Sequence, residues 1–429
     1  MKLLPIILSL IIVICLIGSI LLVPKIKIKK LEFQTFWLVA MVGAIVLILF
    51  GCVSFSDLKE SFLSDSSVNP VKILVLFVSL SSLSIYLDEL GFFSALAAFF
   101  AKRFSKNQYV LFFGFYFAIS LLTVFTSNDI IILTFTPFLC HLCKKNKIHP
   151  LPYLMMEFVA ANTWSSLLII GNPTNIYLAS FFNLGFLEYF MDMLLPTAVT
   201  SLTGLVILFL LFRKDLKTPI TPNPEEKVEL KKVPLVVGLI HLAGCTILLS
   251  ISSYLNFPMW IIAFCFASSL IIFVIFYSFF TKKNEVFPLL KRLPWNLIPF
   301  VLSMFVVVLA LRNSGFIEEI ATILLSWNPV FSFGYSGLAI ANLINNIPMA
   351  VFFSSLLTNA PLSAVYSSIL ASNVAAYLTP IGALAGIMFL NLTEKQGLKI
   401  NFFTFVRYGA MIGILSATVG FMTIWLLPI

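Results

Sequence analysis

Polar and helix-breaking residues interrupt four long apolar stretches of this chain, and the interruptions follow the same order in its two halves. Asn162 and Asn373 are 211 positions apart, and Gly171 and Gly382 are separated by the same 211 positions. Paired interruptions at matching places are typical of membrane proteins built from two structural repeats. The four interruptions are Ser127-Asn128-Asp129, Gly171-Asn172-Pro173-Thr174-Asn175, Asn345-Asn346 and Thr379-Pro380-Ile381-Gly382.

The apolar character of the chain excludes a water-soluble globule. Hydrophobic residues make up 60% and charged residues 10% of the sequence, whereas soluble domains carry roughly 25% charged residues. The apolar runs are about 20 residues long, enough to cross roughly 30 Å of hydrocarbon. They lack the alternating pattern of an outer-membrane barrel. The fold class predicted is an all-α polytopic membrane protein, embedded in the lipid bilayer of the cytoplasmic (inner) membrane.

The positive charge is distributed in the way that sets membrane orientation. Although the net charge is +9, Lys and Arg fall in short clusters between apolar runs, so the charge does not indicate a nucleic-acid partner. Clusters of this kind mark cytoplasmic loops. Placing them on one side predicts that both termini face outward. The basic clusters include those at residues 25–30, 102–106, 144–147, 213–232 and 282–292.

The hydropathy pattern predicts about ten transmembrane helices plus two re-entrant hairpins in an inverted repeat. We divide the chain into a first span with a basic loop (1–30), a first repeat (31–212), a cytoplasmic linker (213–232) and a second repeat (233–429). The first hairpin (109–140) opens to the cytoplasm and the second (330–358) opens outward. We interpret the first apolar run as a retained span, because no small-residue cleavage site follows it. The spans are predicted at 3–23, 36–55, 71–87, 151–182, 191–212, 233–254, 258–280, 295–311, 362–390 and 403–427.

A broken helix survives at membrane depth only where protein or a watery cavity surrounds its free backbone groups. Helix N-termini at such breaks attract anions, and freed carbonyls attract cations. Amide and hydroxyl side chains there replace part of an ion's hydration shell, and the alternative is that they only cap helices at the surface. The predicted substrate-binding residues are Asn128, Asn172, Thr174, Asn175, Asn345, Asn346, Asn373 and Thr379, and the predicted coupling-ion residues are Ser127, Asp129, Gly171 and Gly382.

Ionisable residues inside apolar runs are expensive to hold there and are therefore candidates for function. Asp129 is expected to carry a coupling proton or to bind Na⁺, or else to cap the second helix of the hairpin. Glu157 is expected to reach the cytoplasmic interface from near the start of its span. Asp88 and Arg312 each precede a glycine by three positions, and we interpret them as anchors at span ends.

No motif of a catalytic or nucleotide-binding site is visible, so an enzyme is not expected. Cys140-His141-Leu142-Cys143 offers soft metal ligands, but no second pair completes a tetrahedral site. We therefore expect no metal and no cofactor other than a coupling Na⁺ or H⁺.

At its four interruptions, together with Thr136-Pro137 and Asn345-Asn346-Ile347-Pro348, the chain resembles the ion transporter superfamily. The resemblance is to arsenite permeases, sodium/proton antiporters of the ArsB/NhaD kind, and citrate and other anion permeases, and it covers about residues 30–429. It implies a substrate held between two hairpin tips and two unwound helices, with elevator-like or rocking alternation between the two sides. It also implies a homodimer.

These observations predict a secondary active transporter that moves a small inorganic or organic anion, coupled to H⁺ or Na⁺. The alternatives are a Na⁺/H⁺ antiporter, an arsenite efflux permease, a passive channel and a membrane-embedded enzyme. The sequence pattern favours a carrier over the enzyme, because no acid–base cluster accompanies the interruptions.

Overall fold

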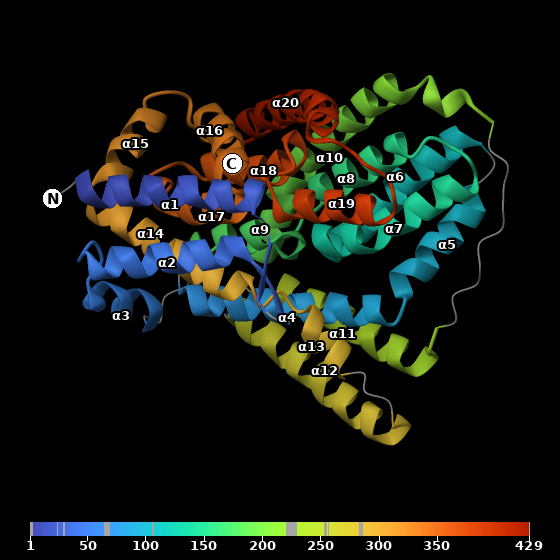
Figure 1. Cartoon of the computed structure of the whole chain (residues 1–429), viewed down its shortest axis with the longest axis horizontal. Helices are drawn as coiled ribbons and strands as arrows, with labels where there is room; N and C mark the ends of the chain where they lie inside the picture. The colour runs from blue at the N-terminus through green and yellow to red at the C-terminus, as the bar shows by residue number, and fades with distance from the viewer. Residues whose placement is uncertain are drawn as a thin grey trace.

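A computed structural model gives the structure of the chain and describes residues 3–428 apart from 24, 29–30, 64–68, 105–106, 220–229, 253–254, 256 and 283–285. The described part is almost entirely helical (Figure 1). Its α-helices are α1 (Leu3–Leu22), α2 (Thr35–Leu49), α3 (Phe55–Leu63), α4 (Pro70–Glu89), α5 (Phe92–Phe104), α6 (Gln108–Val124), α7 (Asn128–Lys145), α8 (Leu151–Trp164), α9 (Pro173–Phe181), α10 (Phe186–Phe212), α11 (Lys232–Ser250), α12 (Met259–Thr281), α13 (Val286–Arg292), α14 (Leu297–Asn313), α15 (Phe316–Leu325), α16 (Pro329–Ile344), α17 (Asn346–Leu356), α18 (Leu362–Leu378), α19 (Leu384–Lys395) and α20 (Phe402–Leu426).

The two halves of the chain repeat the same order of elements. The segment α4–α10 corresponds to α14–α20, so that α6 and α7 match α16 and α17, and the interrupted pair α8/α9 matches α18/α19. Gly91 and Gly315 end the first helix of each segment with the same φ of 78°, a left-handed conformation that favours glycine. Asn107 and Asn328 cap α6 and α16 by accepting a backbone N–H.

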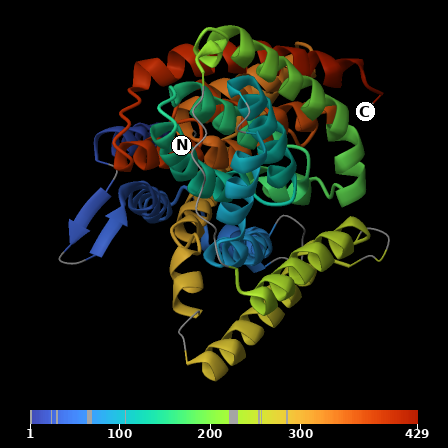
Figure 2. The same cartoon turned by 90° about the vertical axis from the view of Figure 1, so that its right-hand side faces the viewer.

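The helices form two groups. An outer framework contains α1–α4 and α11–α14, in which α12 packs on α4 and α14 packs on α2. An inner bundle contains α6–α10 and α16–α20, with α18 packed between α16 and α20 and in contact with α8. Figure 2 shows α11 and α12 side by side at one edge of the molecule.

The two hairpin-like helix pairs occupy opposite ends of the inner bundle. Figure 1 shows α6 and α7 at one end and α16 and α17 at the other. The turn between α6 and α7 includes Ser127, and Asn345 alone separates α16 from α17. This placement is what an inverted repeat requires; re-entry of the pairs into the membrane from opposite sides stays a prediction.

Seven helical stretches in the described part of the chain are long and apolar enough to cross a membrane. They coincide with seven of the ten predicted spans, and they include the stretch Val286–Asn313, in which α13 leads into α14. The other three predicted spans, at 36–55, 151–182 and 362–390, contain only shorter helices. The two later spans are divided where Gly171 and Pro380 interrupt the helix.

Some elements were not anticipated. The basic loop predicted to end at residue 30 contains the strand β1 (Lys25–Ile28). It pairs antiparallel with β2 (Leu31–Gln34) at the predicted start of the first repeat, and Lys25 is paired to Gln34. Two single-turn 3₁₀ helices are also present, η1 (Ile169–Gly171) and η2 (Asp215–Lys217). Half of the predicted linker, residues 220–229, lies outside the described residues.

We predict that the open ends of the two helix pairs face opposite sides of the membrane. His141 lies near the end of α7 and Thr358 follows α17, and both residues are exposed. After removal of the two exposed native thiols, Cys15 and Cys265, a single His141→Cys variant should react with a membrane-impermeant maleimide only from the cytoplasmic side. Thr358→Cys should react only from outside, and labelling of both from one side would contradict the inverted arrangement.

Candidate functional site

The centre of the inner bundle is formed by two interrupted helices that contact each other. Helix α8 ends at Trp164, and the chain passes through η1 before α9 begins at Pro173. In the second half, α18 ends at Leu378 and α19 begins at Leu384. Pro at the start of α9 costs no hydrogen bond, because the first N–H groups of a helix have no partner inside it.

A glycine in each interruption permits close backbone approach. A Cβ at Gly171 would lie 2.2 Å from the carbonyl oxygen of Ser165, and a Cβ at Gly382 would lie 2.1 Å from that of Ala375. Any larger residue therefore displaces backbone rather than a side chain. The sequence assigned these glycines to a coupling-ion site, and the structure gives them this steric role.

Asn373 on α18 joins the two interrupted helices. Its Oδ1 accepts from Ser165 Oγ at 2.8 Å and from Asn172 Nδ2 at 3.0 Å, while its Nδ2 donates to Asn175 Oδ1 at 2.7 Å. A second contact runs between the hydroxyls of Thr174 and Ser372, 2.8 Å apart. Residues about 200 positions apart in the sequence thus form one hydrogen-bonded group.

Burial makes these contacts necessary. Asn175 and Asn373 are 0% exposed, and Asn172 and Thr174 are 1% exposed. Because water does not reach these side chains, an unpaired amide would keep its full desolvation cost of about 1–3 kcal/mol. Asn175 is satisfied further, because its Nδ2 donates to the carbonyl oxygens of Ser165 and Leu168.

The tip between α6 and α7 reaches the same region. Asn128 Nδ2 donates to Asn162 Oδ1 at 2.9 Å, and Asn162 donates to the carbonyl of Phe158 on its own helix. The Oδ1 atom of Asn128 is buried and has no hydrogen-bond partner among the residues that the structure describes. A buried acceptor left in this way is suited to a cation or to a donor group of a ligand.

Ser127, and not Asp129, caps α7. The Ser127 side chain accepts the backbone N–H of Ile130, so the capping alternative for Asp129 is wrong. The Asp129 carboxylate is left to face a cavity.

The second tip, between α16 and α17, is strained. Asn345 has φ 78° and ψ 155°, a region that non-glycine residues avoid at a cost on the order of 1–3 kcal/mol. Its Nδ2 donates to the carbonyl of Ile381, and the backbone N–H of Asn346 donates to the carbonyl of Gly382 at 3.0 Å. Thr379, half-buried, donates to Asn342 Oδ1 at 2.7 Å. The second tip therefore contacts the interruption between α18 and α19.

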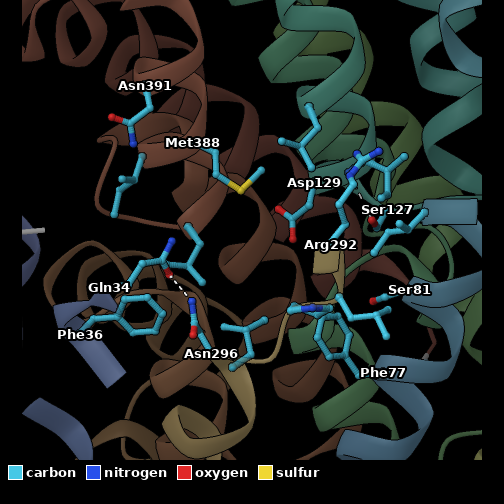
Figure 3. Close-up of a pocket in the computed structure, with 18 of the residues that line it drawn as sticks. Gln34, Phe36, Phe77, Ser81, Ser127, Asp129, Arg292, Asn296, Met388 and Asn391 are labelled. Atoms are coloured by element: carbon cyan, nitrogen blue, oxygen red, sulfur yellow. Dashed lines mark hydrogen bonds between the residues drawn. The ribbon is translucent and has the colours of Figure 1, made fainter. Parts of the chain in front are cut away.

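A cavity of about 300 Å³ lies between the inner bundle and the framework. Asp129 and Ser127 face it from α7, and Arg292 faces it from the end of α13 (Figure 3). Gln34 and Asn296, joined by a hydrogen bond, line its framework side. The other polar lining residues are Ser81 on α4 and Asn391 on α19.

A second cavity, of about 570 Å³, is formed by the corresponding elements of the other repeat. Where the first cavity uses α4, α7 and α19, the second uses α14, α17 and α9. Its charged lining residues are Asp57, Glu60 and Arg312. Asn313 donates to Asp57, and the hydrogen bonds from Ser54 at the start of α3 lower the pKa of that carboxyl below its ordinary value. Matching helices of the two repeats thus line two separate cavities.

Asp88 and Arg312, which each precede a glycine by three positions, differ in their surroundings. Arg312 lines the second cavity. Asp88 receives a hydrogen bond from Thr134 on α7 and forms an ion pair with Arg292, which also contacts Glu89 at 2.7 Å. It therefore ties the inner bundle to the framework, beyond anchoring the end of a span.

The prediction for Glu157 was wrong. Its side chain is 0% exposed and does not reach an interface. It lies between α7 and α8, where the hydroxyl of Thr136 contacts both carboxyl oxygens, at 2.9 and 3.0 Å.

Of the predicted site residues, the structure brings Asn172, Thr174, Asn175 and Asn373 into direct contact. Asn345, Asn346, Thr379 and Gly382 form a second group, and Asn128 contacts Asn162. The sequence-based prediction did not include Ser165, Ser372 and Asn342. Each is a polar residue within one or two turns of an interruption, and this proximity could have identified them. The prediction also missed Arg292 and Asn391, which no local pattern connects to Asp129.

The fold and the site define a polytopic membrane transporter. A family model described as "Citrate transporter" matches residues 26–365, and the chain belongs to that family. It is accordingly a multi-pass protein of the cytoplasmic membrane.

Curated relatives cover most of the chain. An "Arsenical pump membrane protein" of Escherichia coli (strain K12) is 26% identical over 360 residues, 78% of this chain and 81% of the relative. A "Putative arsenical pump membrane protein" of Bacillus subtilis (strain 168) is 24% identical over 415 residues, 86% and 89% of the two chains. The crystal structure of the Alcanivorax borkumensis YdaH transporter is similar in fold, with a TM-score of 0.57 and 13% identity, covering 99% of this chain and 97% of that one.

We predict that neither interruption tolerates a methyl group. Gly171→Ala and Gly382→Ala should each lower the melting temperature of the purified protein and abolish transport, because the Cβ overlaps a backbone oxygen. Gly18→Ala is the matched control, since nothing lies within 4 Å of a Cβ at that position. Wild-type melting of either interruption variant would show that the close approach is not required.

Proposed function

We propose that this protein is a secondary active transporter that moves a small anion across the cytoplasmic membrane by alternating access, coupled to H⁺ or Na⁺. The substrate lies at the central group formed by the residues that flank the two interruptions. Side chains of Asn128, Asn172, Thr174, Asn175, Asn345, Asn346, Asn373 and Thr379 contribute its amide and hydroxyl groups.

The observation that carries this proposal is the pairing of the two interrupted helices, together with two cavities that matching elements of the repeats line. Asn373 hydrogen-bonds to Ser165, directly after α8, and to Asn172 and Asn175 at the start of α9. The cavities at Asp129 and at Arg312 are built from corresponding elements of the repeats. In a carrier, each cavity in turn gives access to the central group. A passive channel instead needs one continuous pore.

The coupling ion is assigned to the first tip. Asn128 Oδ1 is a buried acceptor without a partner in the described part of the chain, and Asp129 is the adjacent carboxylate. Holding an ionised carboxylate at membrane depth costs about 2.5–3.5 kcal/mol on insertion scales. A bound Na⁺ or proton at this position offsets that cost. The first tip is therefore stable at membrane depth when the ion or proton is bound, and binding is in this way coupled to movement of the inner bundle.

Arsenite efflux is the second candidate function. It is favoured by relatives named as arsenical pump membrane proteins over 78–86% of the chain. The central residues are neutral amides and hydroxyls, which suit an uncharged hydroxylated oxyacid as well as an anion. Citrate and arsenite are therefore the first two probes to compare.

The test is uptake into proteoliposomes. Labelled citrate and arsenite should each be measured under a pH gradient and a Na⁺ gradient, and counterflow of the transported probe should distinguish a carrier from a channel. Flux of either probe without counterflow or coupling would contradict the proposal. Gradient-driven exchange of H⁺ for Na⁺ with neither probe present would instead identify a Na⁺/H⁺ antiporter.

We predict that Asp129→Asn inserts and folds normally but loses gradient-driven uptake, because an amide neither takes up a proton nor supplies a carboxylate to Na⁺. Asp215→Asn in η2 is the matched control and should keep wild-type uptake. If Asp129→Asn transports normally under both gradients, the coupling ion does not bind at this residue.

A further inference from the structure

Glu157 is the buried acid that the proposed site does not use. It lies one turn before Ala161 and Asn162 on α8, at the interface with α7, and its side chain is fully buried. The rings of Phe389 and Phe405 pack on the adjacent Phe158. The surroundings on that side are therefore apolar.

The hydrogen bonding of Glu157 fits a neutral carboxylic acid. Thr136 Oγ1 lies 2.9 Å from one carboxyl oxygen and 3.0 Å from the other, but a hydroxyl has only one hydrogen to donate. Within the described residues, an ionised carboxylate in this position would thus have one donor for two oxygens. With a proton bound, the acid donates to Thr136 as well as accepting from it. A buried charge without paired donors is much more costly than the neutral form.

In the described part of the chain, no cationic group pairs with Glu157. The thiol of Cys140, one turn after Thr136 on α7, interacts electrostatically with Glu157 and also with Lys144. Three tyrosines on the helices packed against α8 bond to other groups: Tyr116 to Ser201, Tyr189 to the carbonyl of Ser166, and Tyr377 to Thr163. On α7 itself, Asp129 and Lys144 lie near the two ends of the helix.

The second repeat lacks this acid. Ser368 occupies the position 211 residues after Glu157, and its hydroxyl donates to the carbonyl of Ala364 on its own helix. The repeat architecture therefore does not require a carboxyl group at this place. A carboxyl group that is present in only one repeat, despite the free-energy cost of burying it at membrane depth, is a candidate for a functional role.

A polar connection leads from the region of Glu157 toward the start of α6. Tyr153, one turn earlier on α8, donates to Gln108 Oε1 at 2.9 Å. Gln108 Nε2 in turn donates to the carbonyl of Thr218, in the loop after α10, at 2.7 Å. These groups form a hydrogen-bonded chain that begins at Tyr153, one turn from the buried acid, and ends at the exposed Thr218.

We propose that Glu157 is a proton-binding site of the transport cycle, distinct from Asp129, and this rests on the proposed function. In one step of the cycle the Glu157 carboxylate takes one proton from water on one side of the membrane, and in another step the acid releases that proton to the opposite side. No other bond changes. Thr136 on α7 binds the acid on α8. The same two helices carry Asn128 and Asn162, which contact each other at the first tip, so proton binding at Glu157 changes how α7 and α8 pack there.

Transport measurements test the coupling. In proteoliposomes with equal pH on both sides, Glu157→Gln should exchange labelled citrate or arsenite as the wild type does. Under an imposed pH gradient its accumulation should fall to the level of protein-free vesicles. Ser368→Ala, at the equivalent position of the second repeat, should behave as the wild type in both assays. Accumulation by Glu157→Gln that follows the pH gradient normally would overturn the proposal.

Infrared spectroscopy tests the proton itself, independently of any substrate. The wild-type protein should show the carbonyl stretch of a protonated carboxylic acid, and the band should disappear in Glu157→Gln. Thr136→Val keeps Glu157 and should shift the band, which assigns it even if the glutamine variant does not fold. No band assignable to Glu157 at any pH would overturn the proposal. If neither probe is exchanged by the wild type, the proposed function fails for these probes, while the infrared result still decides whether Glu157 binds a proton.

Discussion

The backbone N–H and C=O groups freed where a helix breaks inside this protein need partners, and that requirement organises the inner bundle. Neither lipid nor an apolar core satisfies a free N–H or C=O group. At the interruption between α8 and α9, the Asn175 side chain donates to the backbone carbonyls of Ser165 and Leu168. Side chains of the two interruptions then pair through Asn373, which contacts Ser165, Asn172 and Asn175. Within each interruption a glycine lets the chain approach a backbone carbonyl closely, that of Ser165 at Gly171 and that of Ala375 at Gly382.

The two repeats share an architecture but not a chemistry. Asn162 and Asn373 each donate to the carbonyl four residues earlier, yet only Asn373 joins both interrupted helices. The first repeat carries Asp129 and Glu157, and the second has Asn346 and Ser368 at the corresponding places. We propose that both repeats contact the substrate and that the coupling ion or proton binds in the first repeat, which carries the two acids. The strained tip at Asn345 belongs to the second repeat.

The sequence was sufficient to predict the helical membrane fold and the interruptions, because apolar length and Gly/Pro/Asn punctuation are local signals. Contacts between the repeats depend on how helices cross, so the partners of Asn373 could be proposed as a set but not paired individually. Arg292 reaches the cavity of Asp129 from a short helix more than 160 residues away, and no local pattern indicates this. Glu157 was wrongly predicted to reach the interface, because its distance from the end of a span does not indicate whether another helix buries its side chain. The strands β1 and β2 were missed because short basic segments next to a span usually form loops.

The central claim is that the two interrupted helices pair directly in the middle of the bundle, and an oxidative cross-link tests it most directly. The hydroxyls of Thr174 and Ser372 are 2.8 Å apart, a separation from which two cysteine side chains are expected to reach each other with little backbone movement. In native membranes, Thr174→Cys combined with Ser372→Cys should form a disulfide on mild oxidation and stop transport until a reductant is added, whereas each single variant should not cross-link. A double variant that stays reduced while both thiols react with an aqueous maleimide would contradict the account.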